Sequence, residues 1–191
     1  MMTATLQGLI MDFTTRLAGL LYCARTDEAR FNGLRRHGNL PFPLDGSDGK
    51  WQKFSYDDVV KLRVMLDLMG EPETEAYVQG LPPALASKVV GNGVSRVGRT
   101  PILVEPGQEV WIGVLLSEGP QTEEEQAEGR NPLRMTDWFA GTIAELGLWE
   151  QGKAPRADGC KPVRLFLVNL SRAARDVGQR AIDFGLLDNK A

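Results

Sequence analysis

The chain has 191 residues, of which 42% are hydrophobic and 25% charged, a composition typical of a soluble globular protein with a buried core. A single histidine and two well-separated cysteines, Cys23 and Cys160, argue against a zinc site, so we expect free thiols, no metal and no cofactor. No stretch approaches the roughly 20 apolar residues that a transmembrane helix needs, and no basic region precedes the apolar N-terminus. These features exclude a membrane protein and favour a cytoplasmic one.

The net charge of −3 is unevenly distributed along the chain. Residues 1–70 carry nine Lys and Arg against eight Asp and Glu, and residues 71–191 carry thirteen against seventeen, which gives +1 and −4. The basic residues of the first part crowd into two short stretches. Because phosphate contact needs only a local basic face, the acidic total does not argue against nucleic acid as a partner.

The first 38 residues predict two short helices separated by a tight turn. Leucines recur at intervals of three and four residues over 16–24, and Thr14 or Thr15 can cap that helix. After a break, Thr26 is expected to cap a second helix that Gly38 ends, with two acidic residues in its first turn.

Residues 40–54 predict a two-stranded loop: a proline-rich extended segment, a turn over 45–49 and a returning strand over 50–54. Ser55 then caps a helix with a broad apolar face over residues 56–69, and Gly70 ends it. Helix, turn, helix, two-stranded loop and helix is the order of a winged helix-turn-helix, so we expect residues 1–70 to form such a domain.

The rest of the chain is expected to contain a linker over residues 71–100, with a short helix at 73–79, and an α+β domain over 101–191. The elements predicted for that domain are strands 102–105 and 110–116 joined by a turn at Pro106-Gly107, an acidic mobile loop over 118–129, a helix from Thr136 to Leu146, a strand over 163–168 and a helix capped by Ser171. The expected fold class is therefore α+β: three helices and a β-wing, followed by a small α+β domain.

A helix-turn-helix places the start of its second helix in the major groove, while the wing and the helix ends contact phosphates. Arginine can read guanine edges, asparagine can read adenine, and wing lysines supply charge to the backbone. The candidate DNA-binding residues are Arg25, Thr26, Arg30, Asn32, Arg35, Arg36, Lys50 and Lys53. A purely structural alternative stands beside this interpretation: Arg35 and Arg36 can complement the helix dipole, and the two lysines can keep an exposed hairpin soluble.

Residues 16–69 resemble the DNA-binding domain of the MerR family of bacterial regulators. The resemblance rests on Gly38-Asn39-Leu40-Pro41, on Gly49 to Phe54, and most specifically on Ser55-Tyr56-Asp57-Asp58-Val59-Val60-Lys61-Leu62-Arg63. It implies a winged helix-turn-helix that binds double-stranded DNA and a role in transcription regulation. Because two-fold symmetric dimers match two-fold DNA sites, we also expect a homodimer. The chain departs from the family at Asn32-Gly33-Leu34, where members carry an Arg-Tyr-Tyr-like cluster. Phage excisionases and some small terminase subunits use related modules, so a phage or adaptor protein with a protein-interaction, DNA-packaging or recombination role is the alternative.

The second half offers no pattern that is typical of an active site. Its residues include no histidine, Gly91-x-Gly93 lacks the spacing of a phosphate loop, and the spacing of Asp137, Glu145 and Asp158 does not indicate a metal site. We therefore expect a protein that is not an enzyme, whose C-terminal domain dimerises or senses a small-molecule or protein effector. A small enzyme using only carboxylates is the remaining alternative.

Overall fold

The computed structural model describes residues 13–44, 52–70, 80–97, 108–151 and 159–187. It is a mixed α+β fold with two antiparallel sheets, which confirms the expected class. The elements in chain order are β1 (Thr14–Thr15), α1 (Leu17–Ala24), α2 (Glu28–Arg36), β2 (Phe54–Ser55), α3 (Tyr56–Met69), α4 (Pro83–Val97), β3 (Val110–Glu118), α5 (Glu123–Ala127), β4 (Arg134–Thr142), α6 (Ile143–Gln151), β5 (Lys161–Asn169) and α7 (Leu170–Asp183).

Helices α1 and α2 form the expected pair, but both of their predicted caps were wrong. Arg16 is at the N-cap of α1 and makes no side-chain cap bond, because the two preceding threonines form β1 instead. Asp27, not Thr26, caps α2: its carboxylate accepts the Arg30 N–H at 2.7 Å. Arg25 adopts the left-handed conformation, with φ 55°, and this turn delays the start of α2 by one residue.

The expected wing strand pairs with a different partner. Phe54 in β2 lies opposite Thr15 in β1, so the segment before α3 pairs with the segment before α1, not with residues 40–44. The Phe54 ring also makes edge contacts with Phe31 at 6.1 Å and Phe42 at 5.9 Å, so the side chain of β2 is anchored in the core. The turn over 45–49 and residues 50–51 lie outside the described residues.

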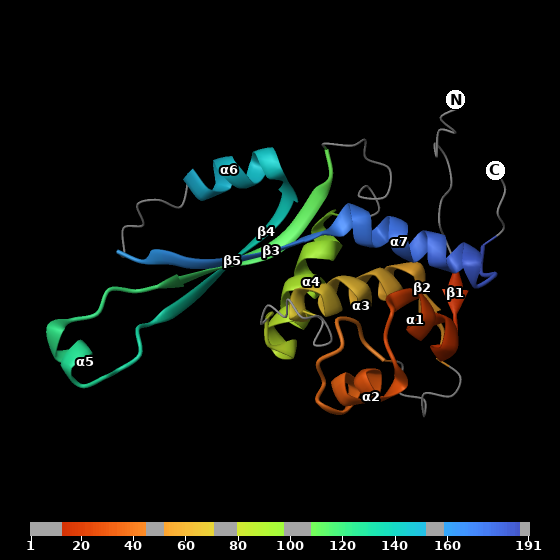
Figure 1. Ribbon diagram of the computed structural model, residues 1–191, viewed down its shortest axis with the longest axis horizontal. Coiled ribbons are helices and arrows are strands. Elements are labelled where there is room, and N and C mark those ends of the chain that lie inside the picture. The colour runs from red at the N-terminus through yellow and green to blue at the C-terminus, as the bar shows by residue number, and fades with distance from the viewer. Residues whose placement is uncertain (1–12, 45–51, 71–79, 98–107, 152–158, 188–191) are drawn as a thin grey trace.

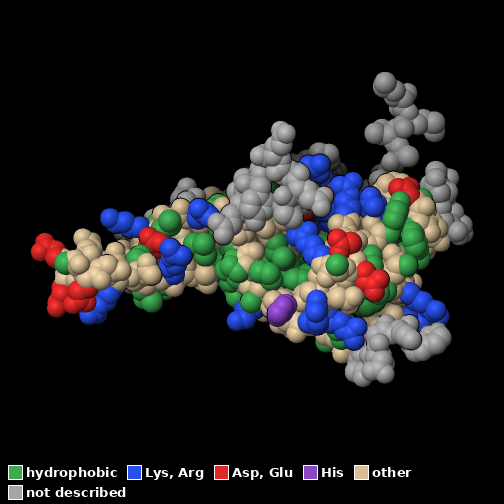
Figure 2. All heavy atoms as spheres, turned by 60° about the horizontal axis from the view of Figure 1, so that its bottom comes forward, with side chains coloured by type: hydrophobic (Ala, Val, Ile, Leu, Met, Phe, Trp, Pro, Cys, Tyr) green, Lys and Arg blue, Asp and Glu red, His purple; other side chains and the backbone are tan. Residues whose placement is uncertain are grey.

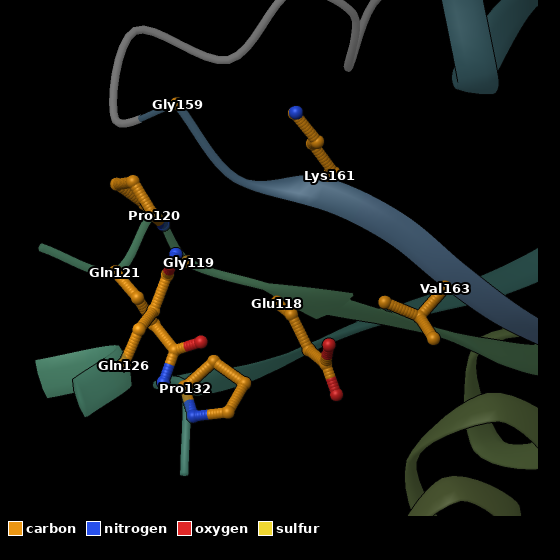
Figure 3. A pocket seen from close by; sticks show the side chains of 9 residues that line it. All are labelled: Glu118, Gly119, Pro120, Gln121, Gln126, Pro132, Gly159, Lys161 and Val163. Atoms are coloured by element: carbon orange, nitrogen blue, oxygen red, sulfur yellow. The ribbon is translucent and has the colours of Figure 1, made fainter. Parts of the chain in front are cut away.

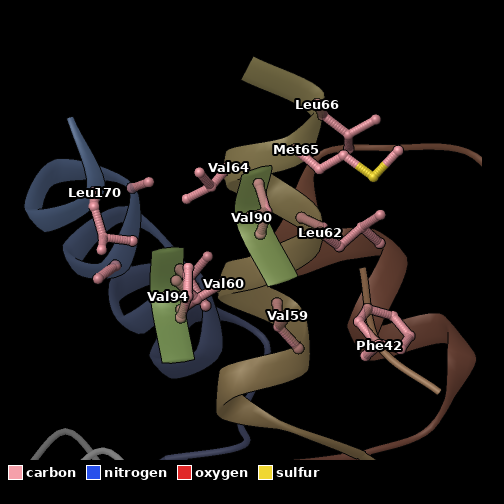
Figure 4. Packing of buried hydrophobic residues seen from close by; sticks show 14 of the residues in the cluster. Phe42, Val59, Val60, Leu62, Val64, Met65, Leu66, Val90, Val94 and Leu170 are labelled. Atoms are coloured by element: carbon pink, nitrogen blue, oxygen red, sulfur yellow. The ribbon is translucent and has the colours of Figure 1, made fainter. Parts of the chain in front are cut away.

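Helix α3 is the centre of the helical part, and its prediction is confirmed. Ser55 and Asp58 form a reciprocal capping box at its start, and Gly70 is its C-cap. Apolar side chains are buried on most sides of the helix, since α1, α4 and α7 all pack against it (Figure 4). Its buried residues are Tyr56, Val59, Val60, Leu62, Val64, Met65, Leu66 and Leu68.

Helix α4 occupies part of the stretch that was expected to be a linker. Its first residue is Pro83, a position where the missing N–H costs nothing. Val89, Val90 and Val94 are buried against α3 and the sheet. The helix that was predicted over residues 73–79 lies outside the described residues.

The larger sheet has the strand order β4-β3-β5 and is antiparallel throughout. The apolar central strand β3 was predicted, and its Ile112 and Val114 belong to the same buried cluster as the helices. Helix α4 covers one face of the sheet, and α6 lies on the other (Figure 1). The Trp149 ring of α6 packs on the Phe139 ring of β4, with 5.6 Å between their centroids. The sheet extends beyond the helices as an arm that ends in α5.

Two predictions in this half were wrong, and a third is not tested. Residues 134–142 form strand β4, although Thr136 was expected to start a helix; the helix begins six residues later at α6, where Thr142 and Glu145 form a capping box. The acidic stretch 118–129, expected as a mobile loop, contains α5 with its own box of Thr122 and Glu125. The expected hairpin partner at 102–105, with its turn at Pro106-Gly107, lies outside the described residues.

Helix α7 closes the core. The strand predicted over 163–168 is present as part of β5, but Asn169 caps α7 in place of Ser171 by accepting the Arg172 N–H. Ser171 is buried and accepts the N–H of Val110 at 2.9 Å, which ties α7 to β3. The inner face of α7 packs on α1 and α3, so both halves of the described chain share one hydrophobic interior.

Cys23 and Cys160 form no disulfide with each other, and both side chains are buried. Among the helices that the structure describes, none combines the length and the apolar character needed to cross a bilayer.

Candidate nucleic-acid interface

Helix α2 has an inner and an outer side. Phe31 and Leu34 are buried against the core, while Arg35, Arg36 and His37 are exposed. Figure 2 shows Lys and Arg side chains beside the single histidine on this face of the molecule. The C-terminal end of α2 is therefore a solvent-facing cationic site.

Three cations that flank α2 are available to a partner: one lies in the turn before the helix and two lie at its C-terminal end. Arg25, Arg35 and Arg36 are exposed, and none of them forms an ion pair with a carboxylate in the described part of the chain. The Nε of Arg36 donates to the backbone oxygen of Asn32 at 3.3 Å, which uses one of its five N–H donors.

Three of the predicted site residues are not freely presented to a partner: two are bonded within the fold and one is buried. The guanidinium of Arg30 is half-buried and donates to the carbonyl oxygen of Gly70 at 3.2 Å, joining α2 to the end of α3. The amide of Asn32 lies 3.5 Å from a carboxylate oxygen of Glu28 on the same helix. The hydroxyl oxygen of Thr26 is buried, and the described residues give it no hydrogen-bond partner.

Only one of the two wing lysines can be placed. Lys53 is exposed between the buried residues Gln52 and Phe54. Because the Phe54 ring packs on Phe31 of α2, Lys53 belongs to the segment that supports this helix. Lys50 lies outside the described residues.

The N-terminal turn of α2 is acidic, which the expected groove contact does not favour. Asp27 and Glu28 are exposed at this end, and a carboxylate near DNA repels phosphate. Positive charge is found at the turn residue Arg25 and at the other end of the helix. The electrostatics therefore favour an approach of phosphates to the C-terminal half of α2.

Sequence reasoning missed a cavity of about 750 Å³ between the helices and the sheet. Three arginines line it, Arg30 from α2, Arg134 from β4 and Arg164 from β5, together with apolar side chains from the α3–α4 region. No local sequence motif identifies this cavity, because only the packing of α4 on the sheet brings its lining residues together.

A second hollow of about 450 Å³ lies along the arm (Figure 3). Its charged residues do not converge: the side chains of Lys161 and Glu118 point away from each other. Glutamine, glycine and proline residues make up most of the remaining wall. The charged side chains of this hollow are therefore not gathered at one point.

The acidic groups with a shifted pKa have structural partners. Hydrogen bonds from Arg175 and Asn169 hold the pKa of Glu109 below its usual value, and those from Thr142 do the same for Glu145. Across the described ranges, no group of three His, Cys, Asp or Glu side chains is arranged to hold a metal ion. No protein-family model and no curated protein matches the chain.

Proposed function

We propose that the protein is a cytoplasmic, sequence-specific double-stranded DNA-binding protein, a transcription regulator of MerR-like type and not an enzyme. The element order over residues 17–69 supports this: two short helices with a three-residue connection, a short strand and a longer helix. A short turn between two helices is the geometry of helix-turn-helix DNA-binding units.

The observation that carries the proposal is the set of unpaired cations at the C-terminal end of α2. Arg35 and Arg36 are exposed without a carboxylate partner among the described residues, and Arg25 and Lys53 add charge from the flanking segments. Arginines held on a rigid helix can contact phosphates without first breaking an internal ion pair. Counterion release on such contacts drives binding to DNA.

The test is fluorescence anisotropy of a labelled random-sequence duplex over a range of salt concentrations. The variant Arg35→Ala/Arg36→Ala removes two charges from the proposed interface. The control Arg130→Ala/Lys161→Ala removes two exposed charges from the arm. We expect the first variant to reduce the slope of log K against log salt by about 2 units and the control to leave it unchanged.

Equal losses in both double variants would show that only overall charge matters and would overturn the proposed interface. Absence of binding by the native chain at about 50 mM salt would overturn the function itself. Sequence specificity is tested by selection from a randomised duplex library. Enrichment of a sequence motif supports a regulator, and selection that enriches no motif contradicts it.

We propose a homodimer, because paired half-sites on DNA suit a two-fold symmetric protein. Helix α6 offers an apolar surface for this contact, with Ile143 at 52% and Leu148 at 70% exposure. The double variant Ile143→Ser/Leu148→Ser is expected to convert a dimer to a monomer in sedimentation velocity. A native chain that sediments as a monomer at about 100 μM would contradict the dimer.

An adaptor protein that uses the same helices to bind another protein is the second candidate. The exposed carboxylates of Asp27 and Glu28 at the start of α2 favour it, since they oppose the entry of this end into a DNA groove. Removing these two negative charges distinguishes the DNA-binding regulator from the adaptor. The variant Asp27→Asn/Glu28→Gln strengthens duplex binding if α2 faces DNA. It leaves duplex binding unchanged if α2 faces a protein.

A further inference from the structure

We propose that the cavity between residues 80–85, with the end of α3, and the sheet binds a small molecule that combines an apolar body with an anionic head group. This site goes beyond the proposed function, since ligand binding there does not depend on DNA. The volume of about 750 Å³ lies within the range of small-molecule sites, about 300–1,000 Å³.

The cavity concentrates positive charge. Arg30, Arg134 and Arg164 line it, and Glu118 provides the carboxylate partner of Arg134, 3.3 Å from its Nε. Arg30 and Arg164 have no carboxylate partner in the described ranges. The three arginines and one glutamate leave an excess of positive charge for a ligand to neutralise.

Strand register explains why the polar groups converge. Leu116 in the central strand lies opposite Thr136 in β4 and Arg164 in β5, so three lining residues form one row across the sheet. Two positions further along β3, Glu118 lies opposite Arg134. Side chains two residues apart on a strand share a face, so the two arginines of the sheet face the same cavity.

Uncharged groups hold Arg164 and Arg30 in place and leave some of their N–H donors available. The guanidinium carbon of Arg164 lies 5.6 Å from the centroid of the Phe166 ring. Arg30 gives one N–H to the carbonyl oxygen of Gly70 and keeps the others of its five. A guanidinium held in this way can still donate paired hydrogen bonds to a carboxylate or a phosphate.

Apolar side chains dominate the rest of the wall. Leu81, Leu85 and Met69 face the cavity from the helical side, and Leu116 and Phe166 face it from the sheet. A nucleic-acid backbone would leave this surface unfilled, whereas an aromatic or aliphatic body covers it and gains hydrophobic free energy. The lining therefore selects a small amphipathic anion.

The test uses three probes that share one naphthyl body and differ in the head group: 2-naphthoate, 2-naphthyl phosphate and the neutral 2-naphthylmethanol. Each is titrated into the full chain, and binding is followed by amide chemical shifts in NMR. The variants are Arg164→Gln and Arg134→Gln, and the control Arg130→Gln neutralises an exposed arginine near α5. Thermal unfolding of each variant checks that it is folded.

We expect at least one of the two anions to bind saturably, with shifts centred on residues 80–85 and on β3 and β5. The neutral probe should bind about tenfold more weakly, and Arg164→Gln should weaken the anion about tenfold, as expected for loss of a charged hydrogen bond. The ratio of carboxylate to phosphate affinity then identifies the head group that the site prefers.

Three results would overturn the site. These are equal affinities for the neutral and anionic probes, unchanged anion binding in both Arg164→Gln and Arg134→Gln, and no saturable binding of either anion up to about 5 mM. The DNA-binding test alters Arg35 and Arg36, which do not line the cavity, so either proposal can fail without the other.

Discussion

The hydroxyl of Tyr56 donates a hydrogen bond of 2.8 Å to the carbonyl oxygen of Ala174, which lies 118 residues further along the chain. Tyr56 is the first residue of α3, and Ala174 lies on α7. Burial raises the pKa of Tyr56 and the neighbouring Asp57 raises it further, so the hydroxyl stays protonated as a donor at physiological pH. This contact ties the last helix to the centre of the helical core.

Tyr56→Phe is expected to lower the free energy of unfolding by about 1 kcal/mol, because it removes one buried hydrogen bond while keeping the ring. Urea unfolding measures the change. Tyr22→Phe is the matched control: the Tyr22 side chain is 40% exposed, and its ring contacts with Phe184 and Arg180 do not use the hydroxyl. Equal effects of the two substitutions would contradict a specific role for the Tyr56 bond.

Ser55→Ala is expected to destabilise the protein by about 1 kcal/mol, because the capping box at the start of α3 loses its hydroxyl. Thr122→Ala breaks the same kind of box at α5, a five-residue helix with no buried residue among those described, and should leave global stability unchanged. Thermal unfolding of both variants measures these changes in stability. A larger loss at α5 than at α3 would be the contrary result.

Gly93→Ala is expected to destabilise the protein by about 1–3 kcal/mol, because a Cβ at this position would lie 2.1 Å from the Cδ1 of the fully buried Ile112. Gly33→Ala, on α2, meets nothing within 4 Å and should stabilise by up to about 1 kcal/mol. Chemical denaturation gives both values. Adding Ile112→Ala to Gly93→Ala tests the cause: the two effects should be non-additive, and simple additivity would refute the clash.

Glu109→Gln is expected to lower stability at pH 7 by up to about 1 kcal/mol, a small value because Glu109 and Arg175 are both partly exposed. The folded pKa of Glu109 lies below the ordinary 4.5, so its contribution is present above that pH and is lost as the pH falls through the folded value. The difference from the native chain at pH 7 should therefore shrink as the pH is lowered below 4.5. Urea unfolding on both sides of this pH measures it, with the exposed Glu124→Gln as control; a difference that persists in acid would contradict the assignment.

Local signals predicted the elements whose start is encoded by neighbouring residues. Ser55 predicted the start of α3, and the apolar run from Val110 predicted β3. The same signal is present for α6, where Thr142 and Glu145 have the spacing of a capping box, but the predicted cap is Thr136. Thr136 lacks an acidic residue three positions later, and its segment is held as a strand by the ladder with β3.

Other elements depend on distant parts of the chain. The glycines of α4 suggested a linker, yet Gly93 is in the helix because its missing side chain lets α4 approach Ile112. β2 pairs with β1, a partner that the hairpin pattern of residues 40–54 does not indicate. Tertiary packing overrides local preference in both cases.

The candidate interface was partly predictable, because exposed arginines at the end of a helix follow from its periodicity. The inward bond of Arg30 was not predictable, since it depends on where α3 ends. The cavity combines Arg30 with Arg134 and Arg164, and no spacing rule connects these residues along the sequence.

The place of α7 in the core has a consequence for biosynthesis. The face of α7 that includes Ala174, Val177 and Ala181 covers α1 and α3, yet these are among the last described residues of the chain. While the nascent chain is still on the ribosome, the first three helices lack this cover and expose apolar surface to solvent. A fragment that stops after Gly70 should therefore aggregate during expression, even though it contains the complete sequences of α1, α2 and α3.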